Sequence, residues 1–194
     1  QIHILTEQKT IDQFNPPVFE NITIKDGLPE NSVTCIVQDY LGYLWLGTQN
    51  GLAKYDGYSM KVFQPEEDNR GSISGRGIVI IYEDKNKTLW IGTVNGLNKF
   101  DRTNESFKVY RYNVNDTNSI NSDQTHCIYE DKNARFWVGT SEGLNLFDRN
   151  NEIFTRFYFR DGDSKSRRTS TSNQYNLSIN AITEDPLSGD LFFG

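Results

Sequence analysis

The chain is poor in the features that mark several common protein classes. None of its 194 residues belongs to an apolar run near the roughly 18 to 20 residues of a membrane-spanning helix, and its mean hydropathy is −0.65. Basic residues are in deficit, with 20 Lys and Arg against 26 Asp and Glu, which disfavours a nucleic-acid-binding surface. Zinc-type spacings, a phosphate-binding glycine loop and a nucleophile elbow are also missing from the sequence.

Other features argue for an ordered domain. Aromatic residues make up 13% of the chain, which is unlike a disordered segment. The length suits one or two domains with a real hydrophobic core.

The N-terminus has neither a basic region nor an apolar core, so it is not a signal peptide as it stands.

A ten-residue segment recurs three times, at residues 43–52, 88–97 and 135–144. Its tryptophans, Trp45, Trp90 and Trp137, are the only three in the protein and stand 45 and 47 residues apart. A degraded fourth copy at 190–194 has Phe192 at the tryptophan position. The repeated residues are Trp45, Gly47, Thr48, Gly51, Trp90, Gly92, Thr93, Gly96, Trp137, Gly139, Thr140 and Gly143.

Each unit contains four strand-like pieces, here named a to d. In the first unit they are residues 32–38, 43–48, 51–55 and 60–64, rich in β-branched and aromatic residues and separated by Asp, Asn and Gly turns. Four short strands at a period of about 45 residues are typical of a β-propeller blade. The sequence therefore predicts an all-β, β-propeller fragment of about four blades, with four antiparallel strands per blade.

The repeat also predicts the organisation of the chain. A strand-like segment at 18–24 has the spacing of a d strand with no a, b or c strand before it, so we expect a fragment of a longer propeller. The predicted parts are an N-terminal extension (1–17), an orphan outer strand (18–24), blade one (32–64), blade two (77–111), blade three (124–159) and the start of blade four (178–194).

Residues that recur at the same position of each unit are interpreted as structural. We expect the tryptophans to pack blade against blade, with Gly permitting close approach. Acids at one position in every unit indicate turn capping rather than a catalytic pair; they are Asp39, Asp84, Asp131 and Asp185. Cys35 and Cys127 share one strand position two blades apart, too far for a disulfide, and are interpreted as buried apolar residues.

Almost all length variation lies in the d–a connections, at residues 65–77, 113–124 and 160–178. These connections and the b–c turns should share one face, which is the candidate recognition surface. Sugar ligands need aromatic faces and polar groups. The candidate ligand-binding residues are Arg70, Arg76, Tyr112, Asn113, Asn115, Asn118, Arg167, Arg168 and Tyr175. The basic cluster that includes Arg167 and Arg168 is either a clamp for an acidic or sulfated glycan or a solvated loop, and the loop is preferred.

Catalytic and metal sites are not expected. His126 is interpreted as a blade-packing or channel-side residue, and the Asp-x-Asn pieces lack the further oxygen ligands of a calcium loop. No cofactor, catalytic residue or metal ligand is therefore assigned.

The unit from Asp26 to Gly57, Asp-Gly-Leu-Pro-x-Asn-Ser-Val … Gln-Asp … Gly-Tyr-Leu-Trp-Leu-Gly-Thr-x-x-Gly-Leu … Tyr-Asp-Gly, resembles the two-component regulator propeller repeats of Bacteroidetes hybrid two-component systems. The resemblance covers residues 18–194, although units two and three lack the Gly-Tyr pair and the fourth copy departs further. It implies the periplasmic sensor portion of an inner-membrane histidine kinase that detects oligosaccharides and controls polysaccharide-utilisation genes.

Under this resemblance the segment is not an enzyme. Its kinase, phosphoacceptor and DNA-binding residues would lie elsewhere in the parent protein, and its expected partners are an oligosaccharide and a second copy in a dimer. Two alternatives stay open: a propeller enzyme acting on polysaccharide, as a glycoside hydrolase or lyase, and a protein-interaction propeller.

Overall fold

The structure is a computed structural model that describes residues 2–5, 19–159 and 177–194. These residues form three four-stranded and two two-stranded antiparallel sheets, with one short 3-10 helix, η1 (Ile24–Asp26). Within the described ranges, no helix has the length and apolar character needed to cross a bilayer. The predicted all-β class is confirmed.

Three complete blades follow one another along the chain, and in each the four strands pair in sequence order. Blade one comprises β3 (Val33–Gln38), β4 (Leu44–Thr48), β5 (Gly51–Tyr55) and β6 (Met60–Phe63). Blade two comprises β7 (Ile78–Glu83), β8 (Leu89–Thr93), β9 (Gly96–Asp101) and β10 (Ser106–Tyr110). Blade three comprises β11 (Thr125–Glu130), β12 (Phe136–Thr140), β13 (Gly143–Asp148) and β14 (Ile153–Phe157).

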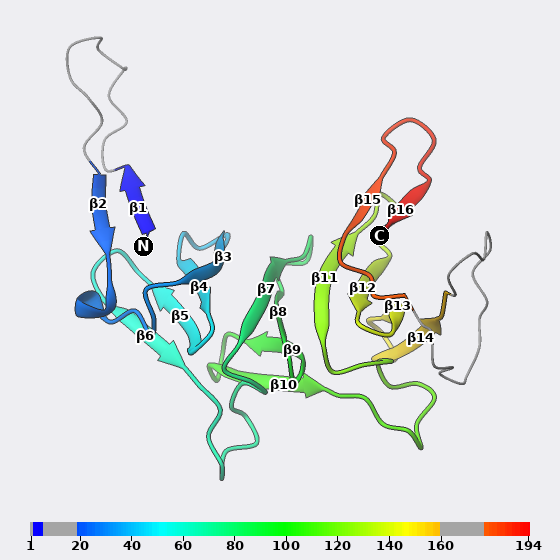
Figure 1. The fold of residues 1–194 in the computed structure, drawn as a ribbon, viewed down its shortest axis with the longest axis horizontal. Coiled ribbons are helices and arrows are strands. Elements are labelled where there is room, and N and C mark those ends of the chain that lie inside the picture. The colour runs from blue at the N-terminus through cyan, green and yellow to red at the C-terminus, as the bar shows by residue number, and fades with distance from the viewer. Residues whose placement is uncertain (1, 6–18, 160–176) are drawn as a thin grey trace.

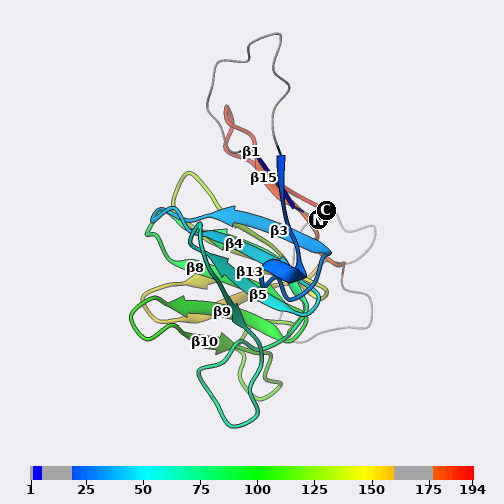
Figure 2. The ribbon, with the colours of Figure 1, turned by 90° about the vertical axis from the view of Figure 1, so that its left-hand side faces the viewer.

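The blades are arranged side by side in an open arc (Figure 1). The first strands, β3, β7 and β11, lie toward the inner side, and β6, β10 and β14 lie toward the outer side. Figure 2 shows the strands of the sheets running across the molecule and the connection after β6 extending beyond β10. This arrangement is that of consecutive propeller blades, so the predicted fold of about four blades is confirmed.

A two-stranded sheet stands at each end of the arc (Figure 1). At one end β1 (Ile2–Leu5) pairs antiparallel with β2 (Phe19–Ile22), and at the other β15 (Ile182–Glu184) pairs with β16 (Leu191–Phe193). The prediction of an orphan strand at 18–24 is corrected here, because β1 supplies a partner from within the predicted extension. Pairing satisfies backbone groups that a lone strand would leave open.

The hydrophobic core lies between blades. The Trp45 ring, fully buried, stacks on Phe63 of its own blade at 5.8 Å and meets Phe100 of blade two edge-to-face at 4.9 Å. One junction later, Trp90 meets Phe147 of blade three edge-to-face at 5.3 Å. Each indole therefore fills the space between its own sheet and the next, which confirms the packing role predicted from the repeat.

Glycine permits the close approach of successive blades at the second strand. A Cβ at Gly92 would lie 2.7 Å from Ile80 Cγ2 in its own blade and 2.9 Å from Thr125 Cγ2 in the next. Cys35 and Cys127, which face the corresponding glycines of β4 and β12, are both free thiols. Burial raises the pKa of the Cys127 thiol to about 11, in keeping with the predicted apolar role.

Candidate functional site

One end of every blade carries the a–b and c–d turns, here called the turn face. Its repeated element is a carboxylate that closes its own a–b turn and accepts the indole proton. Asp84 Oδ1 accepts the backbone N–H groups of Asn86 and Thr88, both at 2.9 Å, and its Oδ2 accepts from Trp90 Nε1 at 3.0 Å. The same bonds recur at Asp39 with Trp45 (2.8 Å) and at Asp131 with Trp137 (2.9 Å). The predicted turn-capping role is confirmed, and the indole contact is additional.

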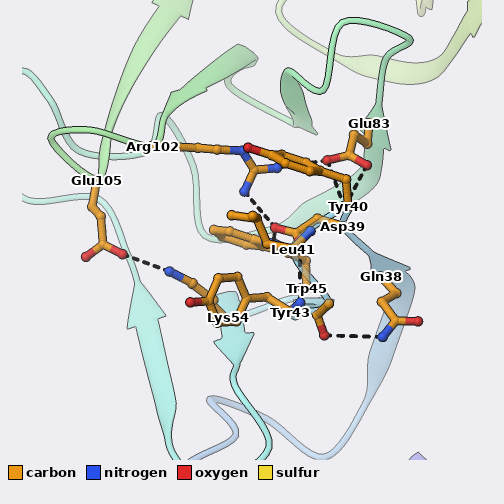
Figure 3. A network of polar contacts seen from close by, with 11 residues as sticks. Gln38, Asp39, Tyr40, Leu41, Tyr43, Trp45, Lys54, Glu83, Arg102 and Glu105 are labelled. Carbon is orange, nitrogen blue, oxygen red and sulfur yellow. Dashed lines mark hydrogen bonds and ion pairs between the residues drawn. The ribbon is translucent and has the colours of Figure 1, made fainter.

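An arginine of the next blade reaches back to this carboxylate (Figure 3). Arg102 Nη1 donates to Asp39 Oδ2 at 2.6 Å and Nη2 donates to Glu83 Oε1 at 2.9 Å, while Glu83 accepts the N–H of Tyr40 in blade one. Burial alone would raise the pKa of Asp39, but the hydrogen bonds from Trp45 and Arg102 outweigh it, so the pKa lies below its ordinary value. The group therefore stays ionised although it is buried.

The pattern repeats at the second junction and changes at the third. Arg149 Nη2 lies 3.3 Å from Asp84 Oδ2 and 3.2 Å from Glu130 Oε1. At Asp131 the guanidinium comes from Arg135 of the same turn, 2.5 Å away. Two junctions thus share one ionic arrangement that bridges neighbouring blades.

A second ionic contact joins blades at the c–d turns. Glu105 of blade two pairs with Lys54 and Lys61 of blade one, with 2.9 Å between Lys54 Nζ and Glu105 Oε1. Glu152 of blade three pairs in the same way with two lysines of blade two, Lys99 and Lys108. Both glutamates are more than a quarter exposed, so these pairs are individually weak and act as a set.

The opposite end carries the b–c turns and the d–a connections, and is here called the loop face. At the first junction Arg76 Nη1 donates to Asn50 Oδ1 at 3.2 Å, and Gln64 Nε2 donates to the Asn50 carbonyl at 2.5 Å. The Asn50 side chain also donates to the Pro29 carbonyl at 3.3 Å. Exposed amide and guanidinium groups of three segments therefore meet here, a set of donors and acceptors that suits a polyhydroxylated ligand.

At the second junction, residues 113–119 fold around one guanidinium. Arg156 of β14, 6% exposed, donates from Nε to the Ser119 carbonyl at 2.7 Å and from Nη2 to the Asp116 carbonyl at 2.6 Å. Its Cζ lies 5.4 Å from the ring centre of Tyr112, which is 40% exposed. Arg156 therefore supports the Tyr112 ring while part of the ring is exposed to solvent, as a ring that stacks on a ligand requires.

The other predicted ligand residues fall in different settings. Arg70 precedes Gly71, whose carbonyl accepts the Phe107 N–H at 2.7 Å, so this part of the connection lies along the outer edge of blade two rather than beside Arg76. The Asn113 side chain is used within its loop, accepting the Asn115 N–H at 3.0 Å, and the Asn118 carbonyl accepts the Phe154 N–H at 2.8 Å. The candidates Arg167, Arg168 and Tyr175 lie outside the described residues.

The remaining candidates for chemistry in the described ranges are clusters of metal-ligating residues and His126. Among those residues no group of three or more His, Cys, Asp or Glu could hold a metal ion. His126 Nδ1 lies 3.0 Å from Ser178 Oγ, and this hydroxyl is also 3.3 Å from Asn180 Oδ1. The pair lies between β11 and the segment that leads into β15.

Comparison with known proteins gives these repeats a family. A model described as two-component regulator propeller matches residues 27–50 and 72–95. The chain contains two-component regulator propeller repeats. Each match runs from the end of a d–a connection to the following b–c turn and so includes the capping aspartate and the tryptophan of a blade. Blade three repeats this regulator-propeller geometry outside the matched residues.

The chain is similar to known proteins in both sequence and structure. Over 57 residues it is 44% identical to "Histidine kinase P4" of Formosa agariphila, covering 29% of this chain and 4% of that protein. The extracellular domain of a hybrid two-component system from B. thetaiotaomicron shares the fold, with a TM-score of 0.69, 23% identity and coverage of 90% of this chain and 29% of that one.

A likeness of another kind is to virginiamycin B lyase from Staphylococcus aureus, with a TM-score of 0.60 and 12% identity, covering 94% of this chain and 54% of that one. It concerns the fold alone. The chain therefore spans less than a third of the length of the hybrid two-component domain and just over half of the lyase.

Several structural residues of the regulator-propeller unit were not predicted, although the sequence contains their signal. The tripeptide Phe-Asp-Arg occurs at 100–102 and at 147–149. In both copies the arginine stands twelve residues after the tryptophan of its own blade. Gly-Leu-Asn recurs likewise, and its buried Asn98 accepts the Ser74 N–H at 2.9 Å and donates to the Ile91 carbonyl at 3.0 Å. Aligning the units beyond the tryptophan segment would have found both.

Proposed function

We propose that this chain is the extracytoplasmic, ligand-sensing part of a hybrid two-component sensor histidine kinase that detects polysaccharide-derived oligosaccharides and controls the genes for their use. The observation that carries the proposal is the regulator-propeller repeat. The shared fold with an extracellular domain of a hybrid two-component system and the local identity to a histidine kinase support it. In this proposal the segment is periplasmic, and the membrane anchor, kinase and regulator belong to other parts of a longer protein.

The loop face supplies the binding chemistry in this proposal. Arg76, Asn50 and Gln64 offer hydrogen-bond donors and acceptors at one junction. Tyr112, with Arg156 behind it, offers an exposed ring at the next. Rigid sheets carry both groups on segments of variable length, which is the usual arrangement for recognition on a repeat scaffold.

Signalling requires that the ligand distinguish two arrangements of the receptor. A ligand shifts an equilibrium only by its difference in affinity for the two states. We propose that the states are two arrangements of a dimer, with copies associating through the two-stranded sheets at the ends of the arc. Light scattering across a concentration series tests this step, and a monomer at the highest concentration would contradict it.

The proposal is tested by calorimetric titration of this chain with a panel of oligosaccharides. We expect saturable binding of at least one of them without change in its composition. Arg76→Ala and Tyr112→Ala should each weaken binding by about tenfold, the equivalent of roughly 1.4 kcal/mol for one lost polar or stacking contact. Arg70→Ala, which removes the same side-chain type on the outer edge of blade two, should have a smaller effect.

Other outcomes would favour the alternatives. Release of new reducing ends or unsaturated products from a polysaccharide, lost in a His126→Ala variant, would favour a polysaccharide-acting enzyme. The propeller fold shared with a lyase and the contact between His126 and Ser178 are the observations behind that second candidate. The absence of binding heat with every saccharide of the panel would instead support a protein-interaction propeller.

A further inference from the structure

A cleft of about 430 Å³ lies on the turn face of blade two, away from the loop face. Four of its lining residues are cationic: Lys87 from the a–b turn, Lys99 from β9, Arg102 from the c–d turn and Lys108 from β10. Thr88, Phe100 and Asp101 complete the lining. In a chain with a net charge of −6, this local concentration of positive side chains is unusual.

The fold does not require a cation at the position of Lys87. Blade three, built on the same strands, has Ala134, Leu146 and Thr155 at the positions of Lys87, Lys99 and Lys108. Residues needed for packing recur in every blade, as the tryptophans and aspartates do. Lys99 and Lys108 have counterparts in blade one, Lys54 and Lys61, which pair with Glu105 as Lys99 and Lys108 pair with Glu152. At the position of Lys87, by contrast, blade one has Gly42 and blade three has Ala134. The charge of Lys87 is therefore better explained by a ligand than by the fold.

The four cations of the cleft differ in how fully they are paired with carboxylates. Arg102 is engaged by Asp39 and Glu83, and Lys99 and Lys108 share the single carboxylate of Glu152. The Lys108 side chain is 58% exposed. For Lys87, which is exposed, the described contact is with an aromatic ring, that of Tyr40 at 5.8 Å, and no described carboxylate lies within ion-pair distance. Lys87 is thus the cation best able to meet an anion from solvent.

Tyr40 adds an aromatic surface beside this cleft. Its side chain is 52% exposed, and the Arg102 guanidinium carbon lies 5.0 Å from the centre of its ring (Figure 3). Both cations that contact the ring also line the cleft. An exposed ring beside a free ammonium fits a sugar ring that carries a negative substituent, because the ring takes the C–H face and the ammonium takes the anion.

We propose that this cleft binds the carboxylate or sulfate group of an acidic saccharide, with Lys87 as the main contact, Lys108 as a second cation and Tyr40 beneath the sugar ring. The choice of a saccharide rests on the proposed function, whereas the preference for an anion rests on the cleft alone. The site is separate from the loop face, so the two can be tested independently.

The test uses galactose oligomers in three forms: neutral, oxidised at C6 to galacturonate, and sulfated at C6. Binding is followed by amide chemical shifts of Lys87, Thr88 and Phe100 and by calorimetry. We expect at least one charged form to bind about tenfold tighter than the neutral form, with affinity falling as salt is added. The two charged forms distinguish a carboxylate site from a sulfate site.

The diagnostic variant is Lys87→Gly. Lys87 has φ 66°, a left-handed conformation that glycine adopts freely, so the substitution removes the charge without straining the turn. Ala134→Gly is the matched control, because Ala134 has φ 60° at the same position of blade three. Lys87→Gly should abolish the preference for the charged form, and Ala134→Gly should leave it unchanged.

Two results would overturn this proposal. One is equal affinity of the wild-type chain for neutral and charged forms, and the other is a preference for charge that survives Lys87→Gly. The proposed function would stand after either result, provided that Arg76→Ala on the loop face still weakens saccharide binding. Loss of all saccharide binding would overturn both.

Discussion

The capping aspartate is the residue on which each blade depends most. It closes the a–b turn, accepts the indole proton of its own tryptophan and, at two junctions, meets an arginine of the next blade. A buried carboxylate is costly unless it is paired and hydrogen-bonded. Here four donors reach each of Asp39 and Asp84, so one side chain connects turn, core and neighbour.

Replacing Asp84 by alanine should therefore be severe. Asp84→Ala leaves the Trp90 N–H without its acceptor and removes one of the two carboxylates that face Arg149. We expect the free energy of unfolding to fall by about 3 kcal/mol, measured by urea denaturation. Asp101→Ala is the control, since Asp101 is exposed and caps only its own turn; an equal loss there would contradict the interpretation.

Glycine at the second strand is required by close packing between blades. In Gly92→Ala the new Cβ would meet Ile80 and Thr125 at under 3 Å, and both are branched side chains of packed strands. We expect a loss of about 1–3 kcal/mol by overpacking, read from the midpoint of thermal unfolding. Gly77→Ala should be much milder, because its nearest neighbour is the flexible end of Gln49 at 3.1 Å.

At the scale of the element, the d–a connections do more than join blades. Residues 71 and 118 accept backbone N–H groups from β10 and β14, the outer strands of the following blades. The connections therefore pair with edges that would otherwise stay open. Length variation was assigned to recognition on the sequence alone, but part of the connection at 65–77 and part of that at 113–124 have this structural role.

Arg156 should control the shape of residues 113–119. Arg156→Lys keeps the charge but loses the planar arrangement of donors that reaches Ser119 and Asp116. We expect faster hydrogen exchange at Phe154 and within the loop, with little change elsewhere. The loop at 65–72 is an internal reference, because Val109 stands at the position of Arg156. Unchanged exchange at Phe154 would show that the guanidinium does not organise the loop.

Local patterns made the strands predictable. The first unit was expected at 32–38, 43–48, 51–55 and 60–64, and its strands begin and end within one residue of those limits, because turn residues and alternation act locally. Apolar packing of the tryptophans between units was predicted, but the polar contacts between units were not. Arg102 and Asp39 are 63 residues apart, and only the stacking of two blades shows that they meet.

On the scale of the whole molecule, stability should be nearly a sum over blades and junctions. The first two junctions each combine an indole cluster, an arginine bridging two carboxylates and a glutamate shared by two lysines. The third has Arg135 within its own turn and neither lysine of the pair in blade three. Ionic contacts should therefore matter more at the first two junctions, which makes their pH dependence informative.

Glu152 is the group through which pH should act on the second junction. Hydrogen bonds from Lys108, Tyr110 and Lys99 outweigh partial burial and lower its pKa from 4.5 to about 2. A carboxyl whose pKa is depressed on folding stabilises the folded state above its unfolded pKa, and this contribution is lost as pH falls through the folded value. The window therefore runs from about pH 4.5 down to about pH 2.

Glu152→Gln should remove that contribution. We expect the variant to be less stable than the wild-type chain at pH 7 and the difference to shrink as pH falls from about 4.5 toward 2. Added salt should reduce the difference at pH 7, because the pair is partly exposed. Urea denaturation at a series of pH values measures this, with Glu67→Gln on the exposed connection as the control. A constant difference from pH 7 to 2 would mean that the lost contacts of Glu152 are steric rather than ionic.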